Sequence, residues 1–166
     1  MTEPTRLPPP IFNTRDYRPA DAQTLVALFR EAILAMGPNA YDDAECKAWA
    51  ARADDEAAFV RRLTDTWVRV AENDDGIVGF GSIVEPGHID LLFTAPRAAR
   101  QGVASLLLED LVFLGAAMGA KILTVDASRL ARPLFLKHGF EEAANVTRCV
   151  GDIQLECFRM EGVVPN

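Results

Sequence analysis

Apolar residues recur along the chain with two different periods, and each period predicts one kind of element. Over Leu25–Met36 they recur every three or four residues, which predicts an amphipathic helix. The pair Gly37-Pro38 follows directly and predicts a left-handed cap that ends this helix. A short strand over 11–17 should precede the helix, and one or two further helices should lie within 42–63.

From residue 66 onward, short apolar runs separated by turn residues indicate strands, and the helical period returns between some of them. A two-residue hairpin turn is expected at Gly151-Asp152. This order predicts an α/β fold with a mixed sheet flanked by helices. A strand is expected from 66 to a turn at 73–76, and further strands over 77–84, 88–94 and 122–125. Helices are expected over 102–118 and 130–138, and the final strands over 146–150 and 153–160.

The size of the chain predicts one domain. Its 166 residues, of which 49% are apolar, are enough for a single packed core. We place this domain at 11–166 and expect 1–10, with its four prolines, to form a loosely ordered arm. Since no apolar run is long enough to span a bilayer and no export signal is recognisable, we expect a cytoplasmic protein without membrane contact.

Charge and cysteine content exclude further classes. The net charge of -7 argues against nucleic-acid binding. An acidic surface would suit a cationic acceptor. The preferred explanation of the charge is that it keeps a soluble protein from associating. Cys46, Cys149 and Cys157 form no CxxC pair and have no histidine-rich partner segment. We therefore expect no metal site and no disulfide framework, and we expect the cysteines to be small buried apolar residues in a reducing compartment.

The segment 91–104 predicts an anion-binding loop. It consists of a strand, a loop that contains a proline, and Gly102 at the start of a helix. The first turn of a helix has unpaired N–H groups and the positive end of the helix dipole, which together favour a bound pyrophosphate. Gly102 and Ala104 allow close approach, and Arg97 and Arg100 add positive charge. Close packing of helix on strand is the simpler alternative explanation for the glycine.

Two segments carry a resemblance to a known family. Arg100-Gln101-Gly102-Val103-Ala104 resembles the coenzyme A pyrophosphate loop of the GNAT acetyltransferases, in which Gln or Arg, two residues, Gly, one residue and Gly or Ala follow one another. Ala99 stands at the usual Gln or Arg. The segment 131–140 resembles the family's Tyr, three residues, Gly-Phe pattern, with Phe135 in place of the tyrosine that often acts as general acid. The similarity runs over 13–160 and is closest to a subgroup with Gly-His-Ile-Asp, here 87–90.

The resemblance implies a largely antiparallel central sheet and acetyl-coenzyme A as the acyl donor. The backbone of the strand before the loop would line the pantetheine arm, and Ser128 falls where the family often has Asn. The residues implied to bind the coenzyme are Leu92, Phe93, Thr94, Arg97, Arg100, Gln101, Gly102, Val103, Ala104, Ser105, Ser128 and Phe135.

For the reaction, we expect a primary amine to attack the thioester directly, without a covalent enzyme intermediate. Glu85 and Asp90 are the candidate general bases, although either can equally be a solvated or arginine-paired carboxylate. Tyr41 is a candidate acid if its segment covers the acceptor pocket; packing is the alternative. A non-catalytic acyl-coenzyme A-binding regulatory module and a plain interaction domain are competing interpretations. A homodimer through the final hairpin is a further possibility.

Overall fold

The computed structural model describes residues 8, 10–150 and 152–165. The predicted arm, apart from residues 8 and 10, and the predicted turn residue Gly151 lie outside this part, as does the side chain of Cys149. The strands are β1 (Asn13–Asp16), β2 (Trp67–Asn73), β3 (Gly76–Val84), β4 (His88–Thr94), β5 (Ile122–Ser128), β6 (Glu141–Val150) and β7 (Ile153–Val163). The α-helices are α1 (Ala22–Met36), α2 (Asp43–Ala50), α3 (Glu56–Thr64), α4 (Val103–Ala117) and α5 (Arg132–Lys137), with 3-10 turns η1 (Pro19–Asp21), η2 (Gly37–Asn39), η3 (Ala51–Ala53) and η4 (Pro96–Ala98).

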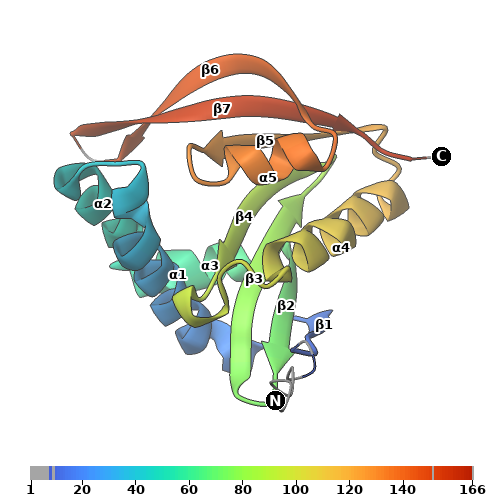
Figure 1. Cartoon of the computed structure of the whole chain (residues 1–166), viewed down its shortest axis with the longest axis horizontal. Coiled ribbons are helices and arrows are strands. Elements are labelled where there is room, and N and C mark those ends of the chain that lie inside the picture. Colours follow the sequence, from blue (N-terminus) through green and yellow to red (C-terminus); the bar gives the residue numbers. More distant parts are fainter. Residues whose placement is uncertain (1–7, 9, 151, 166) are drawn as a thin grey trace, which may run out of the picture.

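All strands belong to one seven-stranded sheet in the order β1-β2-β3-β4-β5-β7-β6 (Figure 1). Only β4 and β5 are parallel neighbours, and every other pair is antiparallel. The predicted mixed, largely antiparallel sheet flanked by helices is therefore confirmed. β6 is an edge strand, and dimerisation through its hairpin stays a prediction.

Helices cover the two faces of the sheet and bury an apolar core on each. Leu25, Phe29 and Leu63 of α1 and α3 pack with Phe80 of β3 and Leu91 of β4 on one face. On the other face, α4 and α5 pack against β3, β4, β5 and β7. Burial of these side chains supplies the main stabilisation of the fold, at roughly 1.5–3 kcal/mol for each large apolar residue.

The parallel pair β4–β5 separates soon after it begins. Residues His88 and Ile89 pair with Thr124 and Val125, and no later residue of these two fully described strands is paired with the other. Figure 1 shows the resulting gap between β4 and β5, with α5 beside it. Backbone groups along the facing edges of the two strands are thus left without sheet partners and face the opening.

A β-bulge lies at the start of the opening. Ser82 pairs with Leu91 but its neighbour Ile83 pairs with Ile89, so Asp90 is an extra residue in β4. An extra residue places two successive side chains on one face of the sheet. Accordingly, Asp90 bonds to Arg62 of α3, and Leu91 joins the core on that same side.

The element order was predicted correctly, but the expected left-handed cap at Gly37 is wrong. Gly37 has φ -53° and continues into the turn η2. A Cβ at this position would lie 2.7 Å from Sγ of Cys46, so the glycine permits close approach of α1 and α2. β5 also continues to Ser128 and β6 begins at Glu141, because both strands pair with the middle and end of β7 beyond the residues that the apolar pattern marks.

Among the described residues, no helix is long and apolar enough to cross a membrane.

Candidate active site

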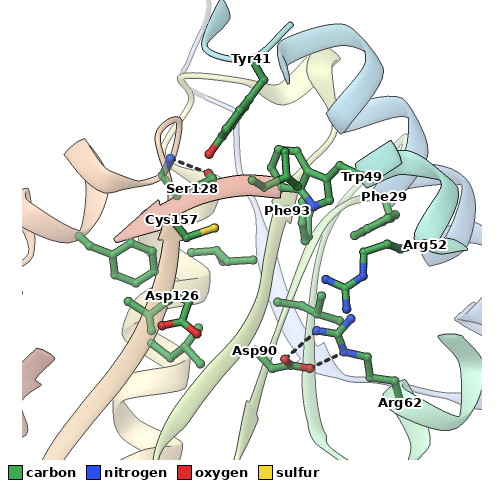
Figure 2. A pocket seen from close by; sticks show the side chains of 17 residues that line it. Phe29, Tyr41, Trp49, Arg52, Arg62, Asp90, Phe93, Asp126, Ser128 and Cys157 are labelled. Atoms are coloured by element: carbon green, nitrogen blue, oxygen red, sulfur yellow. Dashed lines mark hydrogen bonds and ion pairs between the residues drawn. The ribbon is translucent and has the colours of Figure 1, made fainter. Parts of the chain in front are cut away.

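Two cavities meet at the opening between β4 and β5. The larger has a volume of about 590 Å³ and lies beside the start of α4, the end of α1 and α5. The smaller has a volume of about 90 Å³ and lies deeper between β4 and β5 (Figure 2). The residues that line both cavities are Trp49, Leu92, Phe93, Ser128 and Ala131. A ligand in the larger cavity can therefore reach a second ligand in the smaller one.

The start of α4 faces the larger cavity. Arg100 and Gly102 have φ values of 60° and 86°, so the loop turns sharply into the helix. No described side chain caps α4, and a Cβ built on Gly102 would meet no atom within 4 Å. The cavity is lined by Gly102, Val103, Ala104 and Ser105. The N–H groups of these residues have no acceptor within the helix, because they belong to its first turn. This geometry suits a bound pyrophosphate.

The cations predicted for this loop have different surroundings. Arg100 lines the larger cavity, and so does Lys137 at the end of α5, which sequence reasoning missed. Arg97 instead donates to the carbonyl of Ile77 at 2.7 Å, and its own carbonyl accepts from the side chain of Gln101 at 3.1 Å. Neither of these two side chains lines the larger cavity.

The exposed edge of β4 suits an extended, amide-bearing chain. The N–H of Ala95 donates to the carbonyl of Val78 at 2.8 Å, so this group is directed toward β3. Because backbone groups alternate between the two edges of a strand, those of Leu92 and Thr94 are directed into the opening. The pantetheine arm of coenzyme A carries amides that match such an edge.

Aromatic side chains form the roof of the smaller cavity. Trp49 of α2 lies between Tyr41 and Phe93, with ring centroids 5.6 and 6.0 Å away, and Phe29 lies 4.8 Å from Phe93. Figure 2 shows these rings above the charged residues of the cavity. Phe135, predicted to lie beside the coenzyme, is buried and lines this smaller cavity.

Two carboxylates line the smaller cavity, one on each separated strand. Asp90 of β4 accepts two hydrogen bonds of 2.7 Å from Arg62. Asp126 of β5 forms an ion pair with Arg159 of β7, and its side chain is only 8% exposed. Glu85, the other predicted base, is exposed in the turn between β3 and β4 and lines neither cavity.

Tyr41 covers the smaller cavity, and its hydroxyl has two backbone partners. It donates to the carbonyl of Glu156 at 2.8 Å and accepts from the N–H of Arg129 at 2.9 Å. The Arg129 guanidinium lies over the Tyr41 ring and donates to the carbonyl of Ala40. Burial raises the pKa of Tyr41 above its ordinary value, so the phenol keeps its proton at neutral pH.

The described cysteines are not arranged as a metal or disulfide site. Cys46 and Cys157 are buried thiols that form no disulfide with each other, and burial raises the pKa of Cys46. Cys157 lines the smaller cavity, a position that nothing in the sequence indicated. Among the described residues, no group of three or more His, Cys, Asp or Glu side chains is placed to hold a metal ion.

A helix N-terminus beside two separating parallel strands, with joined cavities at the opening, suits a transferase that binds an acyl-coenzyme A. Comparison with known proteins agrees. Residues 38–161 match the family model described as the acetyltransferase (GNAT) domain. The chain therefore belongs to the GNAT acetyltransferase family, which confirms the predicted family and the predicted acetyltransferase class. The narrower Gly-His-Ile-Asp subgroup stays a prediction.

Three similar proteins illustrate the relationship. The uncharacterized N-acetyltransferase YafP of Escherichia coli K12 is 38% identical over 127 residues, which are 76% of this chain and 79% of YafP. A crystal structure of a GCN5-related N-acetyltransferase, "Aminotransferase, Class-II", from Rhodopseudomonas palustris has 33% identity and a TM-score of 0.89, covering 97% of this chain and 99% of that one. The PaiA N-acetyltransferase of Thermoplasma acidophilum, solved with coenzyme A, shares the fold at 16% identity and a TM-score of 0.74, covering 92% of this chain and 99% of that one.

Proposed function

We propose that this protein transfers the acetyl group of acetyl-coenzyme A to the nitrogen of a primary amine by direct attack in a ternary complex. The observation that carries the proposal is the junction of the two cavities at Leu92, Phe93 and Ser128. Donor and acceptor can enter from separate sides and meet there. Acetyl-coenzyme A supplies an activated acyl group as a thioester.

The residues of the larger cavity hold the donor. The N–H groups of Gly102–Ser105 and the charges of Arg100 and Lys137 bind its phosphates. The backbone of Leu92 and Thr94 binds its extended arm. A β4 N–H group directed into the opening stabilises the charge that develops on the carbonyl oxygen during attack.

Asp90 is the better placed of the two predicted bases. It lines the acceptor cavity at the β-bulge, whereas Glu85 lies outside both cavities. Each carboxylate oxygen of Asp90 accepts one hydrogen bond from Arg62, and an oxygen can accept a second bond from a water. We assign Asp90 to take the amine proton through such a water.

The leaving thiol does not depend on a protein acid. A thiol with an ordinary pKa of about 8.5 can leave as thiolate or take a proton from water. Tyr41 is poorly suited to donate, since its hydrogen is already bonded to the carbonyl of Glu156. Phe135, at the family's tyrosine position, has no proton to donate.

The test is release of thiol from acetyl-coenzyme A in the presence of a panel of primary amines, with mass spectrometry of both products. Acetylated amine and unmodified protein would support the proposal. An acetyl group on Cys157 or Cys46 that hydroxylamine removes would contradict direct attack.

The non-catalytic acyl-coenzyme A-binding module is the alternative function, and Phe135 is the observation that favours it. Coenzyme binding without thiol release for any amine would establish this alternative.

A further inference from the structure

We propose that the acceptor is a small amine that carries a carboxylate, such as an α-amino acid. Its carboxylate would lie at Arg52, and its amine would lie between the carboxylates of Asp126 and Asp90, the proposed base. This inference rests on the proposed function and specifies the chemical class of its second substrate. It follows from the distribution of charge around the smaller cavity, whose four charged lining residues are Arg52, Arg62, Asp90 and Asp126.

One wall of the smaller cavity carries excess positive charge. Arg52 of η3 and Arg62 of α3 both line it, and Figure 2 shows the Arg52 side chain directed toward Arg62 and Asp90. Asp90 is the one carboxylate on this wall, and it bonds in a bidentate manner to Arg62. Two guanidinium groups and one carboxylate line this wall, and a guanidinium group attracts an anion. A guanidinium binds a carboxylate with two parallel hydrogen bonds.

The opposite wall presents the Asp126 carboxylate, which is paired with Arg159 of β7. Asp126 lies on β5 immediately after the last residue paired with β4, and on the sheet face opposite α4, as its neighbours Val125 and Ala127 belong to the α4 side. Its partner Arg159 is not a lining residue of the cavity and has a side chain that is 40% exposed. An acceptor in the cavity thus meets the Asp126 carboxylate directly, and a carboxylate there favours an ammonium group.

The size and the roof of the cavity narrow the acceptor further. A volume of about 90 Å³ admits a small molecule, not a folded chain. The rings of Phe29, Trp49 and Phe93 offer an apolar surface for a side chain. A polyamine would place a second cation near Arg52 and Arg62, where like charges repel. Arg52, Asp126 and the aromatic rings therefore match the carboxylate, the amine and the side chain of an apolar amino acid.

The test compares matched acceptors in the thiol-release assay. Leucine, methionine and phenylalanine are each paired with their carboxamides, which keep the amine and the side chain and lose the negative charge. A carboxamide has the less basic and more readily deprotonated amine, so a preference for the acid cannot arise from amine reactivity. We expect kcat/KM to be about tenfold or more higher for the acids.

Arg52→Gln supplies the residue-level test, with Arg61→Gln as its matched control. Arg61 is an exposed arginine of α3 that lines neither cavity. Arg52→Gln should raise KM for the preferred acid about tenfold or more, leave KM for its carboxamide unchanged and leave coenzyme A affinity unchanged. Arg61→Gln should change none of these values.

The outcomes separate this inference from the proposed function. Equal or better turnover of carboxamides or polyamines, with no effect of Arg52→Gln, would overturn the inference and leave the acetyltransferase activity intact. Thiol release that is as fast without any amine as with amines would overturn both the inference and the proposed function, because the thioester would then be hydrolysed. Selective turnover of the acids that Arg52→Gln removes would establish the acceptor class.

Discussion

The two cavities of this protein are built in different ways. The larger one presents backbone groups that suit a ligand, namely the N–H groups at the start of α4 and the exposed edge of β4, beside side chains of α1 and α5. The smaller one presents side chains from α1, α2, η3, α3, β4, β5 and β7, with its carboxylates held by arginines of other elements. Backbone groups bind what every member of a fold shares, while side chains can change without changing the fold. We therefore expect the proposed coenzyme site to be shared across the fold and the proposed acceptor site to differ between its members.

Gly102→Glu should have the largest effect, and it tests whether the larger cavity binds the phosphates of coenzyme A. A side chain here has open space, so the substitution causes no internal clash, but its carboxylate would lie in the phosphate site. We expect coenzyme A affinity to fall at least about 100-fold, as lost charge-assisted hydrogen bonds are worth about 1.5–3 kcal/mol each. Calorimetric titration measures this.

Gly119→Glu is the matched control for that variant. Gly119 lies beyond the other end of α4 with a similar φ of 83° and equally open space. It reproduces the backbone strain, about 1–2 kcal/mol, without touching either cavity. Equal loss of affinity in both variants would show that strain, and not the phosphate site, explains the result.

A second prediction concerns Asp90→Asn. If Asp90 accepts the amine proton, kcat falls about 10²- to 10⁴-fold across the pH range, while coenzyme A affinity is kept. Asp110→Asn is the control, because Asp110 forms a similar pair with Arg69 at 2.9 Å and lines neither cavity. Stopped assays over a pH series measure the effect. A kcat that is unchanged in Asp90→Asn would remove Asp90 from the reaction.

The two sites differ in how much of each could be predicted from the sequence, because one is contiguous in the chain and the other is assembled by the fold. The proposed coenzyme loop is contiguous, so residues 91–104 were sufficient to predict its strand, loop and helix start. In the cavity proposed for the acceptor, the sequence indicated Asp90 and Tyr41. It did not indicate Arg52, Arg62 and Asp126, because these come together only in the folded sheet. The β-bulge that turns Asp90 toward Arg62 is one extra residue in an otherwise regular strand, and no turn residue marks it in the sequence.

A third prediction distinguishes structure from chemistry at Tyr41. Tyr41→Phe leaves the Glu156 carbonyl and the Arg129 N–H without their partner, so unfolding free energy should fall by about 1–3 kcal/mol in urea titrations. Tyr17→Phe is the control, because the buried Tyr17 hydroxyl has no hydrogen-bond partner among the described residues. Unchanged stability of Tyr41→Phe together with a kcat lowered 100-fold or more would instead identify Tyr41 as the acid.

The smallest expected effect lies away from both cavities, at Asp21. Hydrogen bonds from Arg15 hold the pKa of Asp21 below its usual value. Its stabilising contribution is therefore complete above the unfolded pKa of about 3.9 and is lost as the pH falls through the folded pKa. Asp21→Asn should reduce this acid-side loss of stability in unfolding curves from pH 7 to 2, with kcat/KM at neutral pH unchanged. An identical pH dependence in the variant would contradict the assigned pair.

The most direct test of the central claim is a crystal structure of the protein with coenzyme A. We expect the pyrophosphate on the N–H groups of Gly102–Ser105, and the thiol end in the opening between β4 and β5, within reach of the cavity that Asp90 and Asp126 line. Phosphates bound at any other surface, or a thiol directed away from that opening, would contradict it.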